Sequence, residues 1–130
     1  MQKYNGIKIY LGERFKFIQN RKIMIPIIKQ VANEYKAQLL KLYGNELVEL
    51  ILFGSYARGD NHEESDVDFA LVLRSSNIHP SEEICKTNFI SLELELKYGL
   101  MLSTIPVSLE KKQRAMQGVY QDIRKEGIII

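Results

Sequence analysis

Two short apolar runs separated by a polar loop constrain the fold of this chain more than any other feature. They are residues 47–53 (LVELILF) and 67–73 (VDFALVL), which have the length and the aliphatic, β-branched composition of buried strands. The first run ends abruptly at Gly54-Ser55, and the stretch up to Ser65 is polar. The pattern predicts a strand, an irregular loop and a second strand.

Amphipathic helices are predicted on either side of these strands. Residues 26–43 carry apolar side chains at steps of three and four, begin with Pro26 and are followed by Gly44. Residues 81–97 show the same period, and we expect their apolar stripe to face the core. The stripe consists of Cys85, Phe89, Leu92 and Leu96. On this interpretation Cys85 is a core residue rather than a nucleophile.

The C-terminal third predicts a further strand and helix. Residues 100–107 have the pattern of a third strand, in which Pro106 indicates an edge or a strand end. Ser108 suits the cap of a final helical region that Gly127 ends, and residues 128–130 could add a short edge strand. The apolar face of that helical region is predicted to be Met116, Val119, Tyr120 and Ile123.

The first residues fit this scheme less well. The segments IKIYL and RFKF alternate apolar and basic residues, which predicts either a small hairpin or an appendage outside the core. We therefore divide the chain into an N-terminal extension, residues 1–23, and one domain, residues 24–130.

Composition excludes several classes of protein. With 130 residues, 45% hydrophobic and 26% charged, the chain is expected to be one soluble domain rather than a disordered or fibrous protein. No apolar run is long enough to span a membrane, and the N-terminus lacks the apolar segment of a secretory signal. The single cysteine, Cys85, cannot form an internal disulfide or a cysteine-based zinc site. These features predict a cytoplasmic protein.

Charge is distributed unevenly along the chain. Residues 1–44 hold nine Lys or Arg against two Glu, residues 45–110 hold four against twelve acidic residues, and residues 111–130 hold five against two. Most such charges belong to solvated faces. An acidic middle between basic ends nevertheless suits a site that holds a divalent cation beside a polyanionic substrate.

The loop after the first strand has the composition of a phosphate site. Gly54 and Ser55 follow a buried strand directly, which places backbone N–H groups and one hydroxyl where they can bind phosphate oxygens. Arg58, one turn later, can bring a positive charge to the same phosphates.

Two aspartates at the start of the second strand have the pattern of a metal site. Asp66 and Asp68 are two residues apart, so the strand period points both carboxylates to the same side. Hard oxygen ligands on one face, with no His or Cys nearby, suit Mg²⁺ or Mn²⁺. The alternate residues Val67, Phe69 and Leu71 are then expected to face the core.

Taken together, these motifs resemble a known family. FGSYARGD followed by SDVDFALVL resembles the signature of the nucleotidyltransferases of the DNA polymerase beta superfamily. More narrowly, it resembles the minimal nucleotidyltransferases (MNT) encoded beside HEPN-domain proteins as toxin–antitoxin pairs. The closing VYQDIRKEGIII is similar to the end of many small members, so the resemblance covers residues 24–130. It implies an α/β (α+β) fold with a small mixed sheet and helices packed mainly on one side.

The resemblance also implies an activity. A hydroxyl would attack the α-phosphate of a nucleoside triphosphate and release pyrophosphate, with ATP as substrate and Mg²⁺ or Mn²⁺ as cofactor. The adenylylated tyrosine would belong to a HEPN-type toxin that is thereby neutralised. A membrane or a nucleic acid is not the expected partner, whereas a homo-oligomer or a hetero-oligomer is compatible with the sequence. By resemblance the nucleotide- and phosphate-binding residues are Gly54, Ser55, Arg58 and Ser65, and the catalytic metal ligands are Asp66 and Asp68.

One element of the family pattern is missing. Active members carry a third carboxylate near the start of the next strand, where this chain has Tyr98-Gly99-Leu100. Glu93 and Glu95 lie nearby but are predicted on the solvated face of their helix. The third carboxylate would complete the metal site and draw the proton from the acceptor.

Three interpretations therefore stay open. The first is an active nucleotidyltransferase, and the second is a catalytically weakened antitoxin that neutralises its partner by binding alone. The third, which the small size of the domain disfavours, is a transferase for a small hydroxylated molecule. His62, in the loop before the aspartates, is close enough in sequence to reach a nucleotide but is expected to be solvated.

Overall fold

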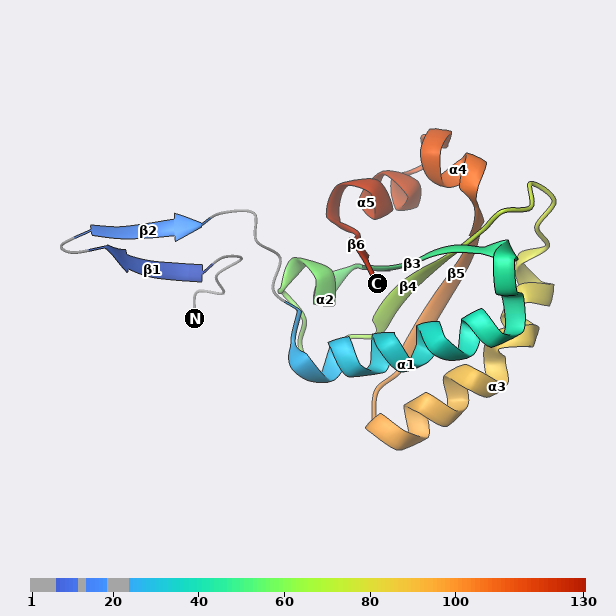
Figure 1. Ribbon diagram of the computed structural model, residues 1–130, viewed down its shortest axis with the longest axis horizontal. Coiled ribbons are helices and arrows are strands. Elements are labelled where there is room, and N and C mark those ends of the chain that lie inside the picture. The colour runs from blue at the N-terminus through green and yellow to red at the C-terminus, as the bar shows by residue number, and fades with distance from the viewer. Residues whose placement is uncertain (1–6, 12–13, 19–23) are drawn as a thin grey trace.

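The computed structural model describes residues 7–11, 14–18 and 24–130. Its main body is a four-stranded sheet between two layers of helices (Figure 1). The strand order is β5-β4-β3-β6, where β3 pairs antiparallel with β4 and β6, and β4 pairs parallel with β5. The strands are β3 (Leu47–Phe53), β4 (Val67–Leu73), β5 (Leu102–Ser108) and β6 (Ile128–Ile129). The predicted small mixed sheet is confirmed.

The two outer strands explain local features of the sequence. In the four-stranded sheet β5 lies at one edge and carries Pro106, which can be accommodated there because an edge strand leaves one side of its backbone unpaired. The short strand β6 forms the other edge, against β3. Both edge positions were expected from the sequence.

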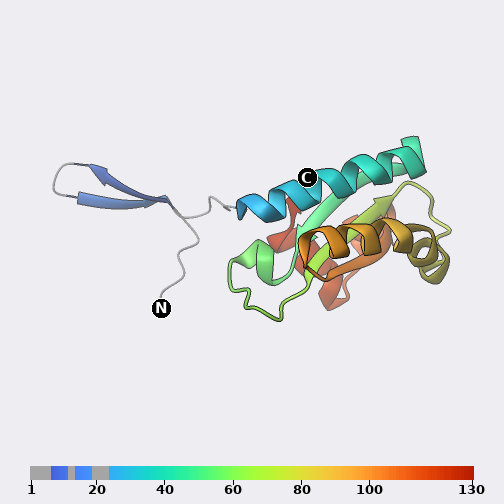
Figure 2. The same cartoon turned by 90° about the horizontal axis from the view of Figure 1, so that it is seen from below.

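The long helices α1 (Pro26–Tyr43) and α3 (Pro80–Tyr98) cover one face of the sheet (Figures 1 and 2). The predicted bounds of α1 are confirmed, and its apolar face is buried except for Leu42, which is 44% exposed. Tyr35 is fully buried in this layer, stacked edge-on against Phe69 of β4 with ring centroids 5.3 Å apart. Its hydroxyl contacts the Thr104 hydroxyl at 2.7 Å and the Ser91 hydroxyl at 3.2 Å. Tyr35 thus joins α1 to α3, β4 and β5.

The orientation predicted for α3 is wrong. The stripe expected in the core faces outward, with Phe89 77% and Leu96 79% exposed, and Cys85 is exposed as well. The buried residues of α3 are Thr87 and Leu94. Thr87 is tolerated there because its hydroxyl bonds to the carbonyls of its own helix, one turn back. The side of α3 that packs on the sheet is therefore not the stripe that the sequence periodicity indicated.

The short helices α4 (Leu109–Arg114) and α5 (Gly118–Glu126) cover the opposite face of the sheet. The backbone N–H of Lys111 donates to the Ser108 hydroxyl, which confirms the predicted cap. The single predicted helical region is instead two helices, and Met116 between them is 73% exposed rather than on the apolar face. Gly127 ends α5 where a Cβ would lie only 2.5 Å from the Ile51 side chain, so glycine lets the chain turn into β6.

Two shorter elements complete the main body. The 3-10 turn η1 (Gly44–Glu46) links α1 to β3, and α2 (Ser55–Arg58) follows β3 at its other end. Near the N-terminus, β1 (Ile7–Leu11) and β2 (Arg14–Ile18) pair antiparallel in a two-stranded sheet of their own. The remaining residues of the predicted extension lie outside the described residues, and its division from the domain stays a prediction.

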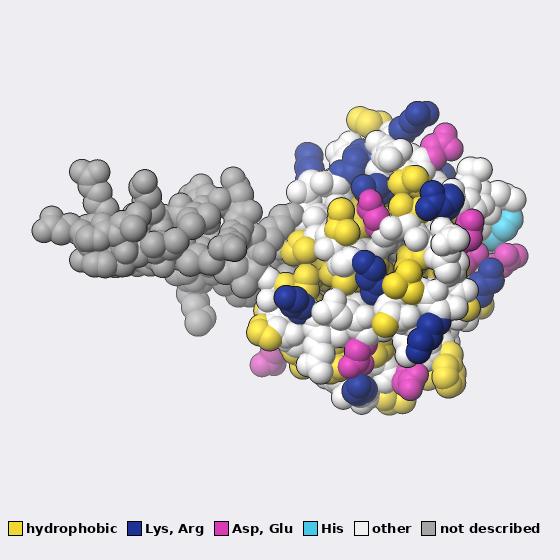
Figure 3. Space-filling model, viewed as in Figure 1, with side chains coloured by type: hydrophobic (Ala, Val, Ile, Leu, Met, Phe, Trp, Pro, Cys, Tyr) yellow, Lys and Arg dark blue, Asp and Glu magenta, His cyan; other side chains and the backbone are white. Residues whose placement is uncertain are grey.

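The two ends of the sequence that are rich in Lys and Arg do not form one basic patch on the face drawn in Figure 3. Among the described residues on that face, Lys and Arg side chains are interspersed with acidic and hydrophobic ones. No helix in the described part of the chain is long and apolar enough to cross a membrane.

Removing the Tyr35 hydroxyl is expected to destabilise the fold. In Tyr35→Phe the half-buried Thr104 hydroxyl loses its partner, which should lower the free energy of unfolding by about 1–2 kcal/mol. Urea denaturation followed by circular dichroism measures this. Tyr120→Phe is the matched control, because that side chain is only half-buried. Equal effects of the two substitutions would contradict the role given to Tyr35.

Candidate functional site

The site begins where β3 ends. Gly54 has φ +75° and ψ −158°, a conformation that L side chains rarely adopt, and it turns the chain into α2. A Cβ at this position would overlap the Asp68 carboxylate. Glycine is therefore required at position 54 for two reasons: the positive φ angle and the close approach of the Asp68 side chain.

The pairing of β3 with β4 brings Asp68 to this turn. Phe53 lies opposite Asp68 in the antiparallel register. Val67, Phe69 and Leu71 are fully buried toward α1 and α3, as predicted. Because side chains alternate along a strand, Asp68 lies on the opposite face, the side covered by α5.

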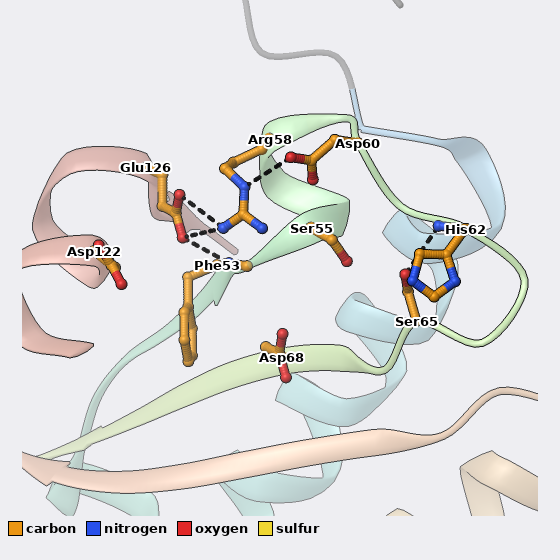
Figure 4. A pocket seen from close by; sticks show the side chains of 10 residues that line it. Phe53, Ser55, Arg58, Asp60, His62, Ser65, Asp68, Asp122 and Glu126 are labelled. Carbon is orange, nitrogen blue, oxygen red and sulfur yellow. Dashed lines mark hydrogen bonds and ion pairs between the residues drawn. The ribbon is translucent and has the colours of Figure 1, made fainter. Parts of the chain in front are cut away.

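A cavity of about 470 Å³ opens at this edge of the sheet (Figure 4). It brings together five of the six residues predicted from sequence, and Figure 4 shows the side chains of Ser55 and Asp68 pointing toward one another across it. The sixth, Asp66, is exposed and lies one residue before β4, outside the cavity lining. The lining residues are Phe53, Gly54, Ser55, Arg58, Asp60, His62, Ser65, Asp68, Asp122 and Glu126.

The loop between α2 and β4 is shaped by its own hydrogen bonds. The backbone N–H of His62 donates to the Ser65 hydroxyl at 2.9 Å, and the Nδ1 atom of His62 accepts from the backbone N–H of Glu64 at 3.2 Å. His62 is exposed, as expected, and its side chain also borders the cavity. The loop thus holds Ser65 at the rim, beside the start of β4.

Asp122 and Glu126 belong to the site although sequence reasoning did not select them. They are four residues apart on α5 and both face the cavity. Glu126 accepts a hydrogen bond from the Gly54 backbone N–H at 3.0 Å and pairs with Arg58 Nη1 at 3.0 and 3.1 Å. The i, i+4 spacing was visible in the sequence, but only the packing of α5 on the sheet shows which cavity it faces.

Glu126 therefore already accepts hydrogen bonds from two of the groups that are predicted to bind phosphate. Its carboxylate contacts both the Gly54 N–H and the Arg58 guanidinium, while Asp60 holds the Arg58 Nε at 3.1 Å. A carboxylate and a phosphate oxygen compete for the same donors. A phosphate oxygen that accepts from the Gly54 N–H must displace Glu126 from that group, and one that accepts from Arg58 Nη1 competes with Glu126 for it.

Strand β5, which pairs parallel with β4 beside Asp68, carries no carboxylate. The residue paired with Asp68 on β5 is Ser103, and Tyr98-Gly99-Leu100 lie at the end of α3 and in the turn after it. Glu93 is exposed, as predicted. The prediction that Glu95 is solvated is wrong. Glu95 is half-buried, and its carboxylate accepts a hydrogen bond from the Leu102 N–H, at the start of β5, at 3.0 Å. Within the described residues, no three acidic, His or Cys side chains cluster as metal ligands.

Electrostatics in the cavity are unfavourable without a cation. Burial raises the pKa of Asp68, the nearby charge of Asp66 raises it further, and Arg58 opposes both. Among the lining residues, Arg58 is the one Lys or Arg against four carboxylates: Asp60, Asp68, Asp122 and Glu126.

The residues present fit a hard divalent cation. Mg²⁺ is commonly held by one or two carboxylates together with substrate phosphates, so Asp68 in the cavity, with Asp66 two residues before it, would be enough protein ligands. Such a cation would also relieve the repulsion that raises the pKa of Asp68.

Neutralising Asp68 should stabilise the cation-free protein. Because the pKa of Asp68 is raised in the folded state, folded protein holds this proton at a pH where unfolded protein has lost it. Wild-type stability must therefore fall as pH rises from the ordinary Asp pKa through the raised one. Asp68→Asn removes this loss, so its melting temperature should exceed that of wild type at pH 7 in EDTA.

The difference between Asp68→Asn and wild type should shrink toward zero at low pH, where Asp68 is protonated in both states. Thermal melts across a pH series measure it, with Asp122→Asn as the control from the same cavity. A wild type that is more stable than Asp68→Asn at neutral pH without cation would contradict the argument.

Known proteins share this fold and sequence pattern. A family model described as a nucleotidyltransferase domain matches residues 32–130. A relative from Methanocaldococcus jannaschii named "Putative protein adenylyltransferase MJ0604" is 31% identical over 104 residues, covering 79% of this chain and 93% of the relative.

Solved structures agree with that match. One chain of a toxin-antitoxin crystal structure with AMP-PNP superimposes with a TM-score of 0.51 at 19% identity, covering 73% of this chain and 68% of that chain. A structure described as a "putative minimal nucleotidyltransferase" gives a TM-score of 0.51 at 18% identity, covering 79% of this chain and 95% of that chain. With the family model matched across residues 32–130, this chain belongs to the nucleotidyltransferase domain family and has the polymerase-beta-like fold of its minimal members.

Proposed function

We propose that this protein is a metal-dependent nucleotidyltransferase that transfers AMP from ATP to a hydroxyl, most readily a tyrosine of a HEPN-type toxin, and thereby acts as an antitoxin. The observation that carries the proposal is the meeting of Gly54, Ser55, Arg58 and Asp68 in one cavity. The relative named as a protein adenylyltransferase and the toxin-antitoxin structure with AMP-PNP support it.

The residues predicted from the sequence have separate roles in this proposed reaction. Ser55 offers its hydroxyl and the Gly54–Ser55 turn its backbone N–H groups to the β- and γ-phosphates, and Ser65 can contact the nucleotide from the opposite rim. Arg58 supplies positive charge once it exchanges Glu126 for phosphate. Asp66 and Asp68 would hold Mg²⁺ or Mn²⁺, which supplies charge neutralisation and alignment of the α-phosphate for in-line attack.

The transfer can be tested with labelled ATP. Wild-type protein, Mg²⁺, ATP labelled on the α-phosphate and the protein encoded by the adjacent gene should give a labelled neighbour. Asp66→Asn and EDTA should each remove the label, because both abolish metal binding. Glu93→Gln, an exposed carboxylate on α3 outside the cavity, is the matched control and should retain it. Absence of label with wild type would refute the proposed activity.

A second candidate function is neutralisation by binding alone. It is favoured by the missing third carboxylate. Active relatives are expected to carry it where this chain has Tyr98-Gly99-Leu100, and Ser103, the β5 residue beside Asp68, is not acidic either. The double variant Asp66→Asn with Asp68→Asn separates the two functions in cells that express the partner. If the variant still protects the cells, binding is sufficient. If it forms the complex but no longer protects them, transfer is required.

Glu126 is expected to weaken nucleotide binding. Glu126→Gln keeps an acceptor for the Gly54 N–H but removes a negative charge beside the phosphate subsite and releases the Arg58 ion pair. The dissociation constant for AMP-PNP with Mg²⁺ should therefore fall about three- to tenfold by calorimetry. Asp122→Asn, which also lines the cavity, is the control and should change it less. A rise in the dissociation constant for Glu126→Gln would show instead that Glu126 supports the metal.

A further inference from the structure

The outward side of α3 carries a continuous apolar stripe on the surface. The α3 outer stripe consists of Cys85, Phe89, Leu92 and Leu96, and Phe89 and Leu96 are more than three quarters exposed. Figure 2 views α3 from this side, with the sheet behind it. An aromatic and two leucines aligned in solvent are typical of an interaction surface rather than of a free helix face.

The stripe has the geometry of a helix–helix contact. Its members are spaced four, three and four residues apart, so they follow one line for about 16 Å along the helix axis. The inner side of α3, where Thr87 and Leu94 are buried, already packs on α1 and the sheet. The outer stripe is therefore a second apolar face that the fold itself leaves uncovered.

The charged residues beside the stripe can pair with the same residues of a second copy of α3. Glu82, Lys86, Glu93 and Lys97 follow one flank of the stripe. If a second α3 lies antiparallel, with the midpoint of the stripe on a two-fold axis, Phe89 faces Leu92 and Cys85 faces Leu96. The axis keeps the charged flanks on the same side, so Glu82 meets Lys97 and Lys86 meets Glu93 of the second copy.

A parallel arrangement lacks this complementarity. It would place the charged flank of one helix against the other flank of its partner, which carries Ser81, Asn88 and Glu95. Glu95 is the one charged residue of that flank, and its carboxylate already accepts the Leu102 N–H of its own chain. In the single chain Lys86 contacts Glu83 at 3.3 Å and Lys97 contacts Glu34 at 3.1 Å. Both lysine side chains remain more than half exposed, so they can reach across to a second helix as well.

We propose that the α3 outer stripe is a homodimer interface, in which α3 of one copy packs antiparallel against α3 of a second copy. The interface lies on the side of the sheet opposite α5, so it leaves both cavities open to nucleotide and to an acceptor protein. One helix pair buries less area than a standard interface, so the dimer should be weak and dependent on concentration.

Sedimentation velocity of the full chain tests the association. From about 5 µM to about 500 µM, a range suited to a weak interface, wild type should shift from monomer to dimer. Phe89→Glu with Leu96→Glu should stay monomeric with an unchanged melting temperature, because both side chains are exposed. Met116→Glu, equally exposed but between α4 and α5, is the control and should dimerise like wild type.

Two further variants test the antiparallel register. Leu96→Cys should give a disulfide-linked dimer on mild oxidation, because residue 96 faces Cys85 of the second copy, whereas wild type should not. Lys86→Glu should weaken the dimer, and adding Glu93→Lys should restore it, because each copy then carries both exchanged charges.

Several results would overturn the proposal. They are a wild type that is monomeric at all concentrations, a dimer that persists in the double glutamate variant, and cross-linking of wild type through Cys85 alone. A stripe that is needed for binding a partner protein, in a chain that is itself monomeric, would assign this face to that partner.

Discussion

The antiparallel pairing of β3 with β4 is the constraint on which the site depends. Its register sets Phe53 opposite Asp68, so the turn at Gly54 begins beside the carboxylate. The alternation of β4 fixes the rest: Val67 and Phe69 are anchored under α1 and α3, and Asp68 must then face α5. A shift of one residue would bury Asp68 in the core and expose Phe69. The hydrophobic layer thus specifies the position of the proposed metal ligand.

The negative charge of Asp68 is unfavourable in the cation-free fold. Desolvation and the neighbouring Asp66 raise the pKa of Asp68, so the cation-free fold is less stable than it would be with a neutral residue there. Glu126 meanwhile satisfies the Gly54 N–H and Arg58, the groups that a phosphate would require. A cation and a triphosphate that arrive together would relieve both features, because each compensates the charge of the other.

Helix α3 shows that the helix face packed on a sheet is not always the most apolar one. The sheet buries Thr87 and Leu94, and Tyr35 adds a hydrogen bond to Ser91 from the same side. The more strongly apolar stripe, with Phe89 and Leu96, is left in solvent. Burial of a threonine is affordable because its own helix satisfies the hydroxyl, so the inner face does not need to be the most hydrophobic one.

The sequence by itself determined the local elements and the signature residues. Strong periodicity marked α1, and the β-branched runs marked β3 and β4. The strand period also predicted that Asp68 and Asp66 point the same way, but Asp66 precedes β4 and lies outside the cavity lining. Tertiary structure alone decided which stripe of α3 is buried, that Glu95 binds the start of β5, and that Glu126 reaches Gly54 across 72 positions. These outcomes depend on how elements distant in sequence pack against one sheet, and periodicity within a single helix contains no information about that packing.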